Sequence, residues 1–149
     1  MKTRYGLEIR AATSADAPGL CELFQEAGVA LSPLALGKRL EAMRQQPGAA
    51  LIALEWGPPS GLVLFHWYTA LQSDQRRAQI TTLLVGPQQR RRGIGRLLIK
   101  AAAQAARTAG CGALELLAAA EQPGLREFCL ATGFSDVAGC FARPLRKGA

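Results

Sequence analysis

A segment rich in glycine and arginine, residues 87–95, constrains this chain more than any other feature. It has the sequence PQQRRRGIG, follows a strand-like run (78–85) and precedes an amphipathic run (94–109). Glycines after a strand let backbone N–H groups approach a ligand closely, and the first turn of a helix adds unsatisfied donors and a partial positive charge. Guanidinium groups supply further charge with bidentate geometry. The segment therefore predicts a phosphate or pyrophosphate site.

The positive charge of the chain is concentrated around this segment. Eight of the 18 basic residues, and none of the 11 acidic ones, lie between positions 75 and 114, although the formal net charge of the whole chain is +7. Such a local excess favours one polyanionic ligand over general binding of nucleic acid. Exposed aromatic residues interleaved with the arginines, which stacking on nucleic acid requires, are missing from the block.

The remaining composition excludes several other classes. The 149 residues and 49% hydrophobic content predict one domain spanning 1–149 with a real core. The four cysteines form no C-x-x-C pair, and with His66 as the one histidine a metal site is not expected. Because no apolar run reaches about 18 residues and no leader is recognisable, we expect a reduced, cytoplasmic protein without membrane contact. We expect a monomer or a homodimer.

Hydrophobic periodicity gives the order of elements as β-α-α-β-β-β-α-β-α-β-β, in an α/β fold with a mixed sheet. The stripe along 94–109 is typical of a helix packed on a sheet, and the crossover after it predicts a parallel strand. Turn residues at 56–60 predict a hairpin between two strands. The expected strands cover 7–10, 50–55, 61–69, 78–85, 113–117, 134–137 and 139–143, and the expected helices start near Thr13, Ser32, Ile94 and Gly124.

These motifs and their order resemble the GNAT acetyltransferase superfamily, which has a three-layer fold. The family signature, [Q/R]-x-x-G-x-[G/A] at the start of a helix, matches residues 90–95. The strand before it often ends in hydrophobic-x-Val-x-Pro, which residues 83–87 match. The family's Phe-Tyr-x-x-x-Gly-Phe corresponds to residues 128–134, with Cys129 in place of tyrosine. In the order of its elements the chain resembles the family over most of its length, but only residues 83–98 match sequence motifs that are specific to the family.

The resemblance implies that acetyl-CoA is bound and that its acetyl group passes directly to an amine. The pyrophosphate is then expected on the backbone of the glycine turn, and the pantetheine arm along the preceding strand, with the acyl group in a cleft between the fourth and fifth strands. A backbone N–H near Leu84 is expected to stabilise the oxyanion. The implied cofactor contacts are Leu83, Leu84, Val85, Arg90, Arg91, Arg92, Gly93, Ile94, Gly95 and Arg96.

Several individual residues keep two interpretations. Arg91 and Arg92 either contact phosphates or face solvent. Cys129 is either a tentative catalytic acid, in the place of the family's tyrosine, or a small buried hydrophobe. His66, which shares a strand face with Tyr68, is either packed or a base near the acceptor. Glu55 and Glu115, which lie at or within expected strands, either orient an amine or face solvent. Because the strand before the motif offers only threonines, a water-mediated base is favoured.

The favoured function is therefore an acetyl-CoA-dependent N-acetyltransferase acting on a small molecule or peptide amine. A non-catalytic acyl-CoA-binding or sensor protein of the same fold is the alternative, because of Cys129 and the missing carboxylate. A nucleic-acid binder ranks last. The acceptor itself has no recognisable signature, although the scarcity of acidic residues in 27–44 and 140–149 argues against a polycation.

Overall fold

A computed structural model describes residues 6–87, 93–117, 124–137 and 140–146. The chain divides into two compact units, Met1–Leu117 and Ala118–Ala149. The arginines expected at the phosphate site, Arg90, Arg91 and Arg92, lie outside the described residues.

The first unit is built on a mixed sheet whose spatial order follows the sequence. Its described strands are β1 (Glu8–Ala11), β2 (Gly48–Leu54), β3 (Gly61–Thr69), β4 (Arg76–Val85) and β5 (Cys111–Leu116). Neighbours are antiparallel from β1 to β4, and β5 runs parallel to β4. The hairpin between β2 and β3 and the parallel crossover into β5 are both confirmed.

Local sequence signals fix where the helices of this unit begin. The helix α2 (Pro33–Met43) begins after Ser32, whose hydroxyl oxygen accepts a hydrogen bond from the Ala35 N–H at 3.0 Å. A short 3₁₀ turn (Ser14–Asp16) leads into α1 (Ala17–Glu26), and the third helix is α3 (Ile94–Thr108). These helices agree with the expected ones apart from shifts at their ends.

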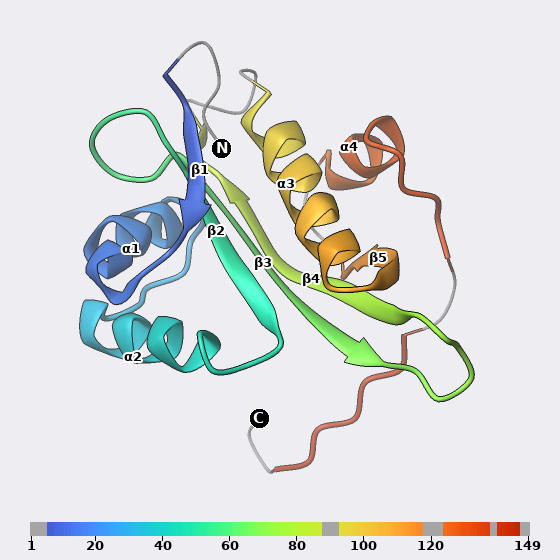
Figure 1. Ribbon diagram of the computed structural model, residues 1–149. Helices are drawn as coiled ribbons and strands as arrows, with labels where there is room; N and C mark the ends of the chain where they lie inside the picture. The colour runs from blue at the N-terminus through green and yellow to red at the C-terminus, as the bar shows by residue number, and fades with distance from the viewer. Residues whose placement is uncertain (1–5, 88–92, 118–123, 138–139, 147–149) are drawn as a thin grey trace. The chain divides into compact units, whose positions relative to one another are not determined.

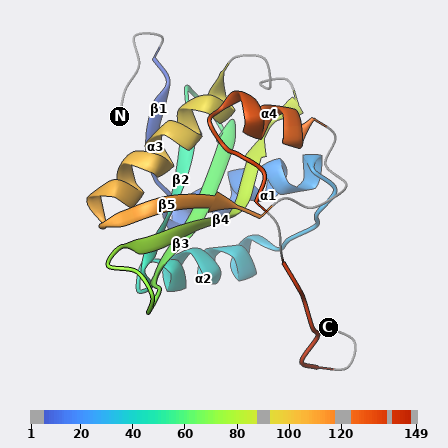
Figure 2. The same ribbon diagram turned by 90° about the vertical axis from the view of Figure 1, so that its right-hand side faces the viewer.

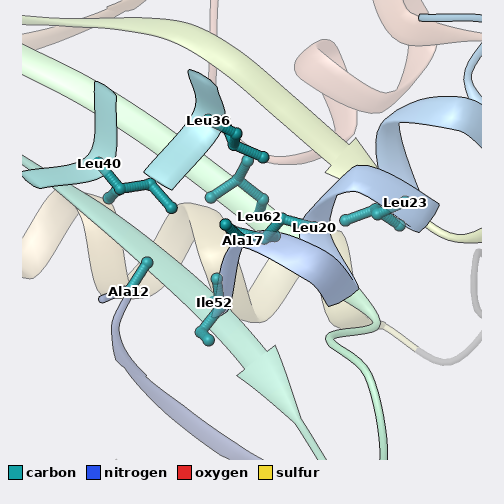
Figure 3. Close-up of a cluster of buried hydrophobic side chains, with 9 residues drawn as sticks. Ala12, Ala17, Leu20, Leu23, Leu36, Leu40, Ile52 and Leu62 are labelled. Carbon is teal, nitrogen blue, oxygen red and sulfur yellow. The ribbon is translucent and has the colours of Figure 1, made fainter. Parts of the chain in front are cut away.

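Helices cover both faces of the sheet. Figures 1 and 2 show α3 on one face and α1 with α2 on the other. On the α1/α2 face, leucines from both helices pack against Ile52 and Leu62 of the sheet (Figure 3). On the α3 face, the side chains of Phe65, Ile80 and Leu98 are each at most 1% exposed. The expected layered α/β fold is confirmed.

The strands β4 and β5 separate before β4 ends. The last paired residues are Ile80 and Leu116, and the Ile80 carbonyl also accepts a hydrogen bond from the Leu117 N–H at 3.1 Å. Beyond Ile80, β4 continues to Val85 beside β3 without a β5 partner among the described residues. Figure 2 shows the two strands side by side at first and then diverging.

The second unit contains the helix α4 (Leu125–Ala131). Gly133 follows it with a φ of +96°, and the Phe134 N–H donates to the Cys129 carbonyl at 3.0 Å, which is the hydrogen bond of a Schellman C-cap. The expected closing strands are wrong for the described residues, since 134–137 and 140–146 contain none. Part of the reason is local, because the Phe134 N–H caps the helix instead of joining a ladder.

Candidate functional site

An irregularity in β4 determines which backbone groups line the space between β4 and β5. Leu64 pairs with Thr82 but the next residue of β3, Phe65, pairs with Ile80, so Thr81 is one extra residue on β4. This is a β-bulge, which bends the strand and changes its twist. It lies where β5 leaves β4, so the bulge and the separation coincide.

The bulge also decides the direction of each N–H group. The Gly86 N–H donates to the Ser60 carbonyl at 2.9 Å, which places this pair on the hydrogen-bonded side of the β3–β4 ladder. Hydrogen-bonded and non-hydrogen-bonded pairs alternate along an antiparallel ladder. The backbone groups of Leu84 and Thr82 therefore face β3, whereas those of Leu83 and Val85 face the open edge.

This alternation bears on the oxyanion contact that the sequence predicts near Leu84. An oxyanion contact from the Leu84 N–H conflicts with the register, because Leu84 pairs with Leu62 of β3 and its N–H belongs to that ladder. The expected contacts at Leu83 and Val85 agree with the register. Sequence alone could not locate the bulge, and uninterrupted alternation from Ile80 would have directed Leu84 outwards.

The start of α3 is the next described element after this open edge. Gly93 precedes the helix with a φ of +76°, a left-handed conformation that favours glycine, and its carbonyl accepts the Leu97 N–H at 3.1 Å. The N–H groups of Ile94 and Gly95 come before that bond, at the end of a helix where the geometry suits an anion. Ile94 and Gly95 are buried here, while Arg96 lies on the exposed side of the helix.

A second glycine lets α3 approach the sheet closely at this end. A Cβ at Gly61 of β3 would lie 2.8 Å from Leu98 Cδ1 and 3.0 Å from Ile94 Cγ2, so a side chain there would require these α3 residues to shift. The absence of a side chain at Gly61 thus positions the first turn of α3 beside the end of β4. Among the described residues, the outward N–H groups of β4 and those at the start of α3 therefore belong to the same unit.

The polar residues that the sequence indicated as possible contacts of the amine lie on three different strands or next to them. Glu115 of β5 is half-buried, and its Oε1 lies 3.0 Å from Nε of Arg77 on β4. His66 and Tyr68 share one face of β3, as expected from alternation. Glu55 follows β2 directly. Sequence analysis missed Arg77 and Gln79 as neighbours of Glu115, because only the register across β4 and β5 brings them together.

Cys129 lies on α4, in the second unit. Burial raises the pKa of its thiol, which keeps the side chain protonated at neutral pH. A protonated thiol is compatible with either interpretation of Cys129, as a proton donor or as a packed residue. Among the described residues no group of three or more potential ligands could hold a metal ion, and no helix is long and apolar enough to cross a membrane.

Comparison with known proteins identifies the family. The model of the acetyltransferase (GNAT) family matches residues 17–134, which is most of the chain. The chain therefore belongs to the GNAT family of acetyltransferases, as the motifs had indicated. A comparison with curated protein sequences gave no significant match.

Solved structures share the fold over nearly the whole chain. A protein of Agrobacterium tumefaciens str. C58, provisionally designated an acetyltransferase, has a TM-score of 0.82 at 27% identity, covering 92% of this chain and 99% of its own. A GNAT family acetyltransferase of Staphylococcus aureus has a TM-score of 0.79 at 17% identity, covering 94% and 99%. An aminoglycoside acetyltransferase from an uncultured soil sample, solved with sisomicin, has 0.77 at 20%, covering 95% and 97%.

Proposed function

We propose that this protein is an acetyl-CoA-dependent N-acetyltransferase. The observation that carries the proposal is the edge of β4 beyond Ile80, which has no β5 partner among the described residues and is followed in the sequence by the first turn of α3. An extended chain with amide groups can pair with such an edge as a further strand would, and a pyrophosphate suits the helix start. The pantetheine arm of CoA has both amides and a pyrophosphate at one end, so the donor set fits it.

The chain's own groups then have separate roles. Leu83 and Val85 offer N–H and C=O groups to the arm, and Gly93, Ile94, Gly95 and Arg96 hold the pyrophosphate. We assign the Leu83 N–H, which lies nearer the separation of the strands, to the thioester carbonyl oxygen in place of Leu84. The assignments of Arg90, Arg91 and Arg92 to phosphate contacts remain predictions.

Bound acetyl-CoA supplies an activated acyl carbon: a neutral amine forms the new N–C bond, the C–S bond breaks, and the CoA thiolate that leaves takes up a proton. The amine must lose a proton during the same reaction. On the face of the sheet that carries Glu115, the described β4 residues beside the bulge are Gln79 and Thr82. Neither is a carboxylate, which supports removal of that proton through water. We assign protonation of the thiolate to water, and Cys129 is then dispensable for turnover.

Thermal melting with acetyl-CoA, CoA and NAD tests cofactor binding. Acetyl-CoA at about 100 times its dissociation constant should add about 2.7 kcal/mol to the free energy of unfolding. NAD also contains a pyrophosphate, so it measures how much of any effect is independent of the pantetheine arm. No stabilisation by acetyl-CoA or CoA would overturn the proposal.

Turnover separates the enzyme from its alternative, a non-catalytic acyl-CoA sensor of the same fold. Both bind acetyl-CoA, but only the enzyme releases CoA in proportion to an added amine. Stoichiometric binding without amine-dependent release of CoA, across amines, amino acids and peptides, would favour the sensor.

A further inference from the structure

One face of the sheet carries a polar row beside the point where β4 and β5 separate. His66 of β3 pairs with Gln79 of β4, which pairs with Glu115 of β5, and paired residues share a face. Tyr68 and Arg77 form the adjacent pair on that face. Two residues before His66 in β3, Leu64 packs against the α1/α2 core, so the same face is apolar under the helices and polar beyond them.

This polar row lies on the route to the proposed reaction centre. Gln79 and Glu115 come one residue before the last β4–β5 pair. The opposite face of the sheet is closed there, because Ala78 and Ile80 are fully buried on the side covered by α3. Tyr68, by contrast, is 43% exposed. Within the first unit, an acceptor therefore has access to the separation of the strands from the polar face.

In this row Arg77 carries a positive charge and Glu115 a negative charge, and each can bind a group of a ligand. Nε of Arg77 lies 3.0 Å from Oε1 of Glu115, with the side chains 45% and 32% exposed. A guanidinium has five N–H donors and a carboxylate has a second oxygen, so each group can bind a further partner. Half-exposed ion pairs contribute little to stability, so loosening the Arg77–Glu115 pair to bind a ligand costs little free energy.

We propose that the acceptor is a small amine that carries its own anionic group, with the amine held by Glu115 and the anion by Arg77. Glu115 alone would suit any amine, but Arg77 beside it disfavours acceptors with several positive charges and favours a carboxylate or phosphate. This inference rests on the proposed acetyltransferase activity and specifies its substrate class. Arg77 is thereby a specificity-determining residue.

Matched pairs of acceptors test this assignment. The L-amino acids are compared with their carboxamides, which lack the anion, and O-phosphoethanolamine with ethanolamine, while release of CoA is measured. For the wild type, kcat/KM for an anionic member should exceed that for its neutral partner by about 10-fold or more. The pair that shows this preference identifies the anion as carboxylate or phosphate.

Two substitutions and one control locate the preference on the sheet. Arg77→Gln should reduce the ratio of anionic to neutral kcat/KM by about 10-fold, mainly through a higher KM for the anionic acceptor. Glu115→Gln should lower kcat/KM for both members of a pair. Arg76→Gln removes the same charge from the adjacent residue, which alternation places on the opposite face, and should leave the ratio unchanged.

The results that contradict the inference differ from those that contradict the proposed activity. Turnover of neutral amines without preference for an anionic partner, or an equal effect of Arg77→Gln and Arg76→Gln on the ratio, would overturn the inference alone. So would turnover of neutral amines with no turnover of any anionic acceptor. Failure of acetyl-CoA to stabilise the protein would instead remove the proposed function.

Discussion

The direction of the N–H groups along β4 can be tested by placing proline at two adjacent positions. Proline removes the backbone N–H and is tolerated in a sheet where that N–H faces outwards. At Leu83 the N–H faces the open edge, whereas at Leu84 it belongs to the ladder with Leu62. Leu83→Pro should therefore impair acetyl-CoA binding, and Leu84→Pro should impair folding.

The expected magnitudes follow from what each substitution removes. Both variants lose a half-buried leucine side chain, which costs about 1–2 kcal/mol of unfolding free energy. Only Leu84→Pro also breaks a ladder hydrogen bond and leaves the Leu62 carbonyl without its donor, at about 1–3 kcal/mol more. We expect Leu84→Pro to be less stable than Leu83→Pro by about 2 kcal/mol.

Urea unfolding and calorimetry with acetyl-CoA measure the two effects separately. Leu83→Ala and Leu84→Ala are the controls, since each removes the side chain and keeps the N–H. Relative to its alanine control, Leu83→Pro should bind acetyl-CoA up to about 10-fold more weakly. The reasoning would be refuted if the two prolines were equally destabilising relative to their alanine controls, or if only Leu84→Pro weakened binding in the folded protein.

Three further predictions concern other parts of the chain. Gly95→Val should weaken acetyl-CoA binding at least about 10-fold in calorimetry by crowding the phosphate site, whereas Arg107→Ala, at the far end of α3, should leave binding unchanged; wild-type affinity in Gly95→Val would exclude this site. Cys129→Ala should reduce kcat less than about 10-fold, a barrier change below about 1.4 kcal/mol, and a loss beyond about 100-fold in a folded variant would make the thiol catalytic. Hydrogen bonds from Arg10 lower the pKa of Asp16 in the folded protein. The contribution of this ion pair to the free energy of unfolding is therefore complete above the unfolded pKa of about 3.9, and it is lost as the pH falls through the lower folded pKa. Asp16→Asn should therefore cost about 1–2 kcal/mol in urea unfolding at pH 7, a difference that disappears near pH 2, and a difference independent of pH would contradict the assignment.

Most elements of the first unit could be predicted because their periodicity is strong. The stripe of α3 and the strand pattern of β3 have hydrophobic spacings that only one structure satisfies, and Ser32-Pro33 marks the start of α2 by known capping chemistry. The phosphate loop stays a prediction, based on the chemistry of a glycine turn between a strand and a helix.

The direction of individual groups in the site could not be predicted. A bulge at Thr81 reverses which β4 residues face outwards, and nothing in a run of threonines and leucines marks the extra residue. The pairing of Arg77 with Glu115 depends on the register of β4 against β5 across a long connection, which spacing does not determine. The short segments 134–137 and 140–143 have too few alternating residues to specify strands.

The central claim is that acetyl-CoA lies along the open edge of β4, and amide hydrogen exchange followed by NMR tests it most directly. In the free protein, the ladder amides of Thr82 and Leu84 should exchange slowly, and those of Leu83 and Val85 should exchange faster. Addition of acetyl-CoA should slow Leu83 and Val85 selectively, together with the first turn of α3. Binding of acetyl-CoA without protection of Leu83 and Val85 would contradict the account.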